Sequence, residues 1–238
     1  MKRQKIRKLI LLIAMFLFPV TIFYLSPYLI IQGALSGIIN GSFIAFCGLF
    51  ISSVFFGRVF CGYLCPASGI MECSVLVNPK LPKLGWRNNI KYVIWILWIT
   101  GVIISFLLRS KEITVNFFYM TDHGISISNI YLFIIYYGIL ILILVPAVVF
   151  GKRAFCHYLC WMAPFMVLGS SLGNLLHLKV LRLEAKKDVC NNCHNCDKNC
   201  PMGIEVSKKV QLGEMEDTEC ILCGECVDRC PKKVITYH

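Results

Sequence analysis

The spacing of the cysteines near the C-terminus constrains this 238-residue chain more than any other feature. The pattern C-x2-C-x2-C-x3-C-P occurs twice, from Cys190 to Pro201 and from Cys220 to Pro231. In bacterial ferredoxins such a run binds [4Fe–4S] clusters, and the fourth cysteine of each run ligates the other cluster. The pattern therefore predicts two clusters. Their predicted ligands are Cys190, Cys193, Cys196 and Cys230 for cluster 1, and Cys220, Cys223, Cys226 and Cys200 for cluster 2.

Two other uses of cysteine fit this spacing less well. Zinc sites use pairs of C-x-x-C, not triplets followed by a C-x3-C-P tail. A disulfide framework requires an oxidising compartment. Iron in a cluster prefers thiolate ligands, and each cubane needs four of them, which the two runs supply together.

The composition separates the chain into two parts. Hydrophobic residues make up 57% of the sequence, whereas about 45–50% is usual for a soluble domain. Residues 179–238 contain ten basic and ten acidic residues, so the net charge of +11 comes entirely from residues 1–178. A basic excess confined to an apolar region indicates membrane topology and lipid contact rather than nucleic-acid binding.

Residues 1–178 contain four uncharged apolar runs of membrane-spanning character. The runs are Leu9–Ile31, Ala34–Gly57, Tyr92–Leu108 and Ile130–Phe150. Pro19 and Pro27 are expected to kink or shorten the first run. The predicted fold is an all-α membrane domain with four transmembrane helices in two tandem hairpins, followed by a small α+β ferredoxin domain with two clusters.

The charges beside these runs predict the topology. Twelve basic residues flank one side, and only Arg109 and Lys111 flank the other. By the positive-inside rule we expect a multi-pass protein of the cell membrane with both termini in the cytoplasm. Residues Ala154–Leu178 are also uncharged, but a fifth span would place the clusters outside. We therefore expect this segment to be interfacial or re-entrant, like Cys61–Val77.

An internal repeat supports the hairpin arrangement. The motif R-x-F-C-x-Y-L-C occurs at Arg58–Cys65 and again at Arg153–Cys160, 95 residues later, each time shortly after a Phe-Gly pair. The pattern indicates a tandem duplication within residues 1–178. We place the repeats at about 9–77 and 92–178, and the ferredoxin domain at 179–238.

The repeated motif contains four further cysteines, which are candidates for a functional site. On a helix, the C-x3-C spacing places two sulfurs on one face, and the repeat would bring the two pairs together. Cys61, Cys65, Cys156 and Cys160 are therefore candidates for an additional metal centre or for redox-active dithiols. The alternative is that they are small buried hydrophobic residues.

These motifs together resemble a family. R-x-F-C-x-Y-L-C-P beside four apolar runs, followed by paired ferredoxin motifs, is similar to the NapH/MauN-like membrane iron–sulfur proteins, of quinol dehydrogenase type. The membrane modules of NosR-type and CcoG-type proteins share the C-x3-C-P pair. The resemblance implies electron transfer between the quinone pool and a partner redox protein, with the clusters as the relay. The chain would then be the electron-transfer subunit of an oxidoreductase complex.

For several other residues the sequence gives a less specific prediction of their role. Arg58 and Arg153 are expected to be topology anchors at the lipid headgroups rather than partners of thiolates. Cys47 and Cys73 are expected in the core, and Glu72 at a solvated interface rather than in a proton relay. His157 could contact quinone or metal, or be a hydrogen-bonded interfacial histidine.

The absence of certain motifs argues against several classes of function. No histidine lies within the four runs, so a bis-histidine haem between them is not expected. No dinucleotide-binding fingerprint or P-loop occurs. Two alternatives to a relay stay open. One is a copper reductase or maturation factor for a respiratory enzyme, as the CcoG-type resemblance suggests, and the other is a redox sensor or scaffold.

Overall fold

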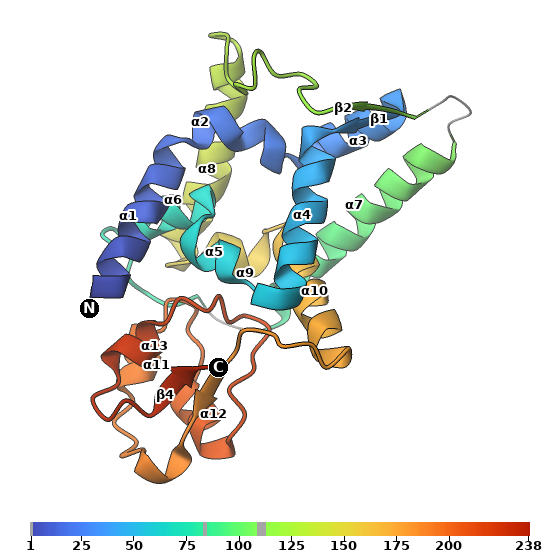
Figure 1. Cartoon of the computed structure of the whole chain (residues 1–238). Coiled ribbons are helices and arrows are strands. Elements are labelled where there is room, and N and C mark those ends of the chain that lie inside the picture. The colour runs from blue at the N-terminus through green and yellow to red at the C-terminus, as the bar shows by residue number, and fades with distance from the viewer. Residues whose placement is uncertain (1, 83–84, 109–112) are drawn as a thin grey trace.

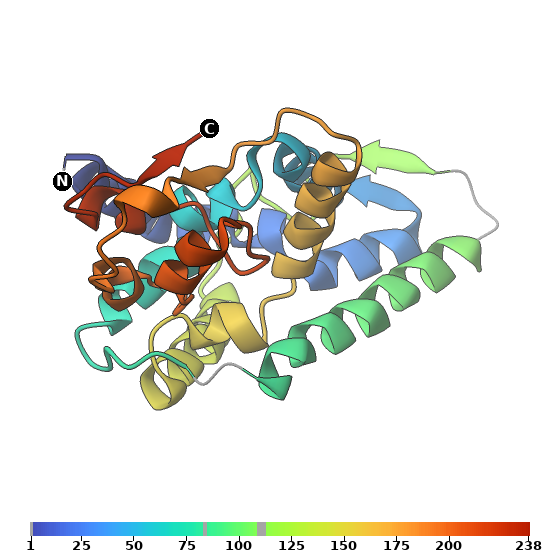
Figure 2. The same ribbon diagram turned by 90° about the horizontal axis from the view of Figure 1, so that it is seen from below.

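The computed structural model describes residues 2–82, 85–108 and 113–238. We call residues 2–178 the membrane part and residues 179–238 the C-terminal part. The membrane part is a layer of helices, and the C-terminal part lies beneath one end of it, beside the N-terminus (Figure 1). Figure 2 shows that α7 (Ile90–Leu107) and the strand pair β1 (Ile38–Asn40) and β2 (Thr114–Asn116) extend beyond the area covered by the C-terminal part.

The first apolar run is bent. Helix α1 (Lys2–Phe16) begins within the basic N-terminal stretch and is followed by α2 (Phe18–Thr21) and the 3-10 helix η1 (Ile22–Leu25), with a bend of 60° at the break. Pro19 lies in α2, and Pro27 is the first residue of α3 (Pro27–Ser36). The predicted kink is confirmed, because neither proline can continue the hydrogen bonding of a preceding helix.

The second apolar run is not the single helix that the sequence predicts. Helix α3 ends at Gly37, which has a φ of 66° in the left-handed region, where glycine is favoured. Strand β1 (Ile38–Asn40) follows and pairs in parallel with β2 (Thr114–Asn116). Helix α4 (Gly41–Phe56) then begins where the Asn40 side chain accepts a hydrogen bond from the Phe43 amide at 2.9 Å.

The third and fourth runs form the helices that the sequence predicts. They are α7, which follows the 3-10 helix η2 (Trp86–Asn89), and α8 (Leu132–Phe150). Among the described residues, these two helices are long and apolar enough to cross a membrane, and the bent α1–η1 pair is a third candidate. Helix α4, with 16 residues, is apolar but shorter. Arg109 and Lys111, the predicted flanking charges of the far side, lie outside the described residues.

Each repeat continues into a pair of short helices. In the first repeat these are α5 (Val59–Tyr63) and α6 (Pro66–Ser74), and in the second α9 (Ala154–Tyr158) and α10 (Ala163–Leu175). The uncharged segment 154–178 is therefore broken and is not a continuous fifth span. Helix α6 packs against α1 and α8, whereas α10 packs against α4 and α7. The last helix of each repeat thus packs against helices of both repeats.

The C-terminal part is a small α+β unit, as the sequence predicts. Strand β3 (Leu183–Ala185) pairs antiparallel with β4 (Ile235–Tyr237), so the two ends of this part lie side by side. Between them lie the 3-10 helix η3 (Lys187–Val189) and three short helices, of which the first and third pack together. The helices are α11 (Asn195–Asn199), α12 (Val206–Leu212) and α13 (Glu225–Arg229).

Candidate metal centres

The structure groups the eight C-terminal cysteines into the two predicted sets. One cavity is lined by Cys200, Cys220, Cys223 and Cys226, and another by Cys190, Cys193, Cys196 and Cys230. We call these cavities site 2 and site 1. In each, three cysteines come from one motif and the fourth from the other motif. Three cysteines of site 2 are buried, whereas Cys193 of site 1 is exposed.

The two motifs adopt the same backbone conformation. Asn192 and Leu222, each just before the second cysteine of its triplet, have φ values of 52° and 50°. His194 and Gly224, each just after that cysteine, have φ values of 54° and 72°. Left-handed φ at a bulky residue such as Leu222 is uncommon and is found mainly where a site requires it. The repeated conformation indicates that both loops are shaped around a similar group.

The donor set fits a [4Fe–4S] cluster better than a single ion. In the described part of the chain, no three His, Cys, Asp or Glu side chains are placed to share one metal ion. The sulfurs instead surround a space, as expected for a cubane in which each thiolate binds a different iron. Burial raises the pKa of Cys220 to about 12, and burial together with Asp197 raises that of Cys196 to about 11. Metal binding at these thiols would therefore release protons.

The four membrane-part cysteines also come together. Cys61, Cys65, Cys156 and Cys160 are all buried, and electrostatic interactions link Cys160 with the other three. We call this group the membrane thiol group. In each pair the first cysteine lies in a short helix and the second follows the helix end, so the predicted continuous helical face is wrong. The two turns are nevertheless equivalent, because the amides of Cys65 and Cys160 donate to the carbonyls of Phe60 and Phe155, both at 3.0 Å.

Arg58 and Arg153 are not headgroup anchors, which corrects the prediction. Both are buried, with 3% and 1% of their surface exposed. Arg58 interacts electrostatically with Cys61, Cys156 and Cys160. Its Nε atom is buried without a hydrogen-bond partner among the described residues. Arg153 interacts with Cys156 and Cys65, and also with Cys223 of site 2. The two guanidinium groups therefore stand between the membrane thiol group and the C-terminal part.

The carboxylate of Glu219 forms the first set of contacts between the C-terminal part and the membrane part. It forms ion pairs with Arg58 at 3.2 Å and with Lys91, and it accepts a hydrogen bond from Asn88 at 3.0 Å. The Nδ1 atom of His157 lies 3.6 Å from it. These cations hold the pKa of the Glu219 carboxyl at about 2 in spite of its burial. Because Glu219 directly precedes Cys220, this network fixes one ligand of site 2 against the membrane part.

A second set of contacts comes from the start of α1. Arg3 pairs with Asp228 at 2.8 Å, and Gln4 donates to the Cys223 carbonyl at 3.0 Å. Arg7 is buried and pairs with Glu72 at 2.8 Å and with Glu225 at 3.6 Å. The basic N-terminal stretch, which the sequence suggests is a topology signal, therefore binds the loop that holds site 2.

Several other expectations also need correction. Glu72 is not simply solvated, because Arg7 and Arg153 both pair with it, and Arg153 and Arg7 lower its pKa despite its burial. His157 is fully buried, and its Nδ1 atom lies 3.4 Å from Asn88 Oδ1, as expected for a hydrogen-bonded histidine, whereas Nε2 lacks a hydrogen-bond partner in the described residues. Cys47 and Cys73 are exposed and not in the core. Glu219, Lys91 and Gln4 were missed because their partners are more than 120 residues away in the sequence.

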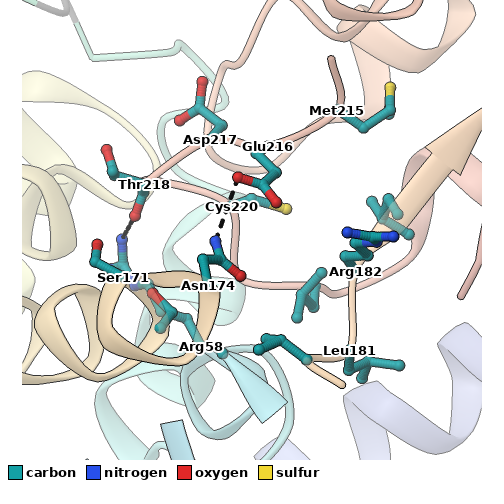
Figure 3. A pocket seen from close by; sticks show the side chains of 15 residues that line it. Arg58, Ser171, Asn174, Leu181, Arg182, Met215, Glu216, Asp217, Thr218 and Cys220 are labelled. Carbon is teal, nitrogen blue, oxygen red and sulfur yellow. Dashed lines mark hydrogen bonds between the residues drawn. The ribbon is translucent and has the colours of Figure 1, made fainter. Parts of the chain in front are cut away.

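Two further hollows border these sites. An apolar cavity of about 250 Å³ is lined by Cys65 and Cys160, together with Phe18, Phe155 and Trp161 from the surrounding helices. A hollow of about 210 Å³ with both polar and apolar lining lies beside Cys220 where α10 meets the loop before the second motif (Figure 3). There Asn174 donates to Glu216 at 3.3 Å, and Arg58 donates to the Thr218 carbonyl at 2.6 Å.

Two family models match separate stretches of the chain. A 4Fe-4S dicluster domain matches residues 189–235, and a 4Fe-4S binding domain matches residues 41–83 and 132–179. The second match covers both membrane cysteine pairs. The chain is a ferredoxin-type membrane protein. Both matched domains are 4Fe-4S domains, and the expected relation to NapH and MauN is confirmed.

Relatives of this ferredoxin-type protein come from archaea and bacteria. They include MJ0749 of Methanocaldococcus jannaschii (27% identity, 76% of the chain, 64% of the relative) and YccM of Escherichia coli (25%, 86% and 57%). NapH of Haemophilus influenzae is 25% identical, over 76% of the chain and 62% of the relative. The chain thus spans about three fifths of the length of these curated relatives. No solved structure matches it.

Proposed function

We propose that this protein is a membrane-bound relay that carries electrons between the quinone pool and a partner redox protein through two [4Fe–4S] clusters. Cluster 1 would be held by Cys190, Cys193, Cys196 and Cys230, and cluster 2 by Cys220, Cys223, Cys226 and Cys200. The observation that carries the proposal is the grouping of these cysteines around two cavities, one against the membrane part and one exposed.

The positions of the two sites support one order of the relay. Site 2 touches the membrane part through Gln4, Glu219 and Tyr63, whose hydroxyl donates to the Cys223 carbonyl at 3.3 Å. Site 1 includes the exposed Cys193. Electrons would therefore enter or leave the membrane at cluster 2 and the aqueous phase at cluster 1. A quinol releases two electrons and two protons, and two one-electron clusters together accept both electrons.

The apolar cavity beside Cys65 and Cys160 supports a quinone as the membrane partner. Its volume of about 250 Å³ exceeds the ~150 Å³ of an apolar cavity that binds benzene. Aromatic side chains line it, and two thiols face it. A quinone ring bound there would lie next to the membrane thiol group, which in turn lies next to Arg153 and site 2.

The membrane thiol group is the candidate for an intermediate redox centre. Four buried cations (Arg7, Arg58, Lys91, Arg153) face the three carboxylates of Glu72, Glu219 and Glu225. An unpaired buried charge is costly. A centre with thiolate ligands at Cys61, Cys65, Cys156 and Cys160 would supply the missing negative charge beside the Arg58 Nε atom.

The proposed topology has four spans in two hairpins, with α1–η1, α4, α7 and α8 as the spanning elements. The N-terminus contacts the C-terminal part through Arg3 and Asp228, which supports placing both termini on one side of the membrane. Most of the basic residues lie on that side, and we infer that it is the cytoplasmic side of the cell membrane.

One contact favours a second function, reduction or delivery of copper. The Cys61 and Met166 sulfurs lie 3.4 Å apart, and thiolate and thioether together are a ligand set that suits Cu(I). Cys61 and Met166 would then bind the copper ion as substrate, and cluster 2 would supply the electron that reduces it.

An EPR-monitored redox titration of the purified protein in lipid tests both functions. The relay predicts that a quinol analogue reduces the clusters without added copper. Copper bound in stoichiometric amount, with clusters that a quinol analogue cannot reduce but that reduce the bound copper, would favour the second function. Clusters that react with neither would contradict both and leave a sensor or scaffold.

A further inference from the structure

The exposed edge of site 1 is surrounded by positive charge. Five cations there are exposed, namely Lys186, Lys187, Arg229, Lys232 and Lys233, and we call this set the basic face. Asp188 is the one exposed acidic side chain in the stretches 186–193 and 229–233, all of which lie in the described part of the chain. The C-terminal part as a whole is neutral, so its basic and acidic residues are concentrated on different surfaces.

Hydrogen bonds hold this face against the cysteines of site 1. The Cys190 amide donates to the Lys187 carbonyl at 3.0 Å, and the Lys233 amide donates to the Cys230 carbonyl at 3.2 Å. The Lys186 amide donates to the Val234 carbonyl at 3.1 Å, which joins the two lysine-containing stretches. These hydrogen bonds hold the two lysine-containing stretches beside the cysteines of site 1.

Acidic residues are concentrated elsewhere. Glu205, Glu214, Glu216 and Asp217 lie in or beside α12 and in the loop that follows it, and Asp217 pairs with Lys209 at 3.3 Å. Glu219, Glu225 and Asp228 are bound by cations of the membrane part, and Glu225 also pairs with Arg229 of the basic face at 3.6 Å. A partner that approaches site 1 therefore meets a mainly positive surface, in which Asp188 is exposed and Asp197 pairs with His194 at 2.9 Å.

We propose that the basic face is the docking surface for an acidic electron-carrier protein. The inference rests on the proposed function, because it requires a cluster at site 1. Opposite charge would raise the encounter rate and orient the carrier with its redox group against Cys193. Each encounter transfers one electron. A [4Fe–4S] cluster held by the cysteines of site 1 would change between its 1+ and 2+ states as the carrier gains or loses that electron, and no atom would be transferred.

Stopped-flow oxidation of the reduced protein in lipid nanodiscs tests the docking surface. The probes are the anionic oxidant ferricyanide, the cationic oxidant hexaammineruthenium(III) and an acidic flavodoxin. Lys187→Glu/Lys232→Glu should slow the reactions with ferricyanide and flavodoxin at least ~10-fold at low salt and accelerate the reaction with the cationic oxidant. The differences should shrink as salt shortens the Debye length.

A matched variant controls for net charge. Lys179→Glu/Lys208→Glu makes the same change of charge at exposed lysines outside the basic face, and its rates should stay within about twofold of wild type. A change in local charge shifts the rates of the anionic and the cationic oxidant in opposite directions. An altered cluster potential would shift both rates in one direction. EPR of each variant verifies that the clusters are retained.

The outcomes distinguish this inference from the proposed function. If both double variants change the rates equally, or neither does, the basic face is not the docking surface. Reduction of the clusters by quinol is measured separately in the same preparations. Its loss with an intact charge dependence would overturn the quinone relay alone, whereas intact quinol reduction without charge dependence would overturn the basic face alone.

Discussion

Site 1 and site 2 are built from the same cysteine motif in the same backbone conformation, yet their surroundings differ. The loop of site 2 is bound by Gln4, Arg7 and Arg58 of the membrane part and is largely buried. The loop of site 1 exposes Cys193 and the basic face. The comparison shows that the motif determines what each loop can bind, whereas its neighbours determine which partner the bound group can reach.

The largest expected difference comes from removing one ligand at each site. Cys223→Ser should abolish electron transfer between quinol and cluster 1, because the relay loses its membrane-facing member. Cys190→Ser should remove cluster 1 but leave cluster 2 reducible by quinol. EPR spectra and iron analysis of the two variants would show this. Quinol reduction of cluster 1 in Cys223→Ser would break the proposed order.

A second comparison uses the residue after the middle cysteine, which is Gly224 in one motif and His194 in the other. A Cβ atom on Gly224 would collide with the Tyr237 hydroxyl and would lie 2.7 Å from the Arg3 guanidinium, whereas His194 is exposed. Gly224→Ala should therefore disrupt packing, at a cost of about 1–3 kcal/mol, and His194→Ala should cost little. Thermal unfolding in detergent measures both, and equal melting temperatures would contradict the difference in packing.

A third comparison removes one carboxylate in the interface and one outside it. Glu219→Gln leaves Arg58 and Lys91 buried without their anion, at a cost of about 3–5 kcal/mol. Glu205→Gln, a change at a side chain that is 77% exposed, should cost less than about 1 kcal/mol. Limited proteolysis of the C-terminal part would report the loosened contact. Equal protection in the two variants would show that Glu219 does not hold the parts together.

The smallest expected difference is kinetic. An iron chelator should remove cluster 1 several-fold faster than cluster 2, because Cys193 is exposed whereas Cys200, Cys223 and Cys226 are buried. Loss of the two EPR signals with time gives both rates. Faster loss of cluster 2 would reverse the assignment of the exposed site.

The sequence predicted the features that depend only on residues close together in the chain. Cysteine spacing anticipated which residues share a cavity, and uninterrupted apolar runs predicted α7 and α8. The break of the second run at Gly37 and Asn40 was missed, because hydropathy alone does not register a left-handed glycine or a helix cap.

Long-range pairing could not be predicted in this way. Arg58 and Arg153 match the rule for flanking charges, but their partners Glu219 and Glu72 lie 161 and 81 residues away. The positive-inside rule counts charges without regard to tertiary contacts. The partner of Gln4 at site 2 is also distant in sequence, so the role of Gln4 was not predicted.

The most direct test of the central claim is an EPR-monitored titration of the full-length protein in lipid, before and after addition of a quinol analogue. The account predicts two [4Fe–4S] signals that interact magnetically, with the signal that survives Cys190→Ser reduced by quinol. A protein that carries zinc in place of iron when isolated anaerobically, or clusters that no quinol reduces, would contradict it.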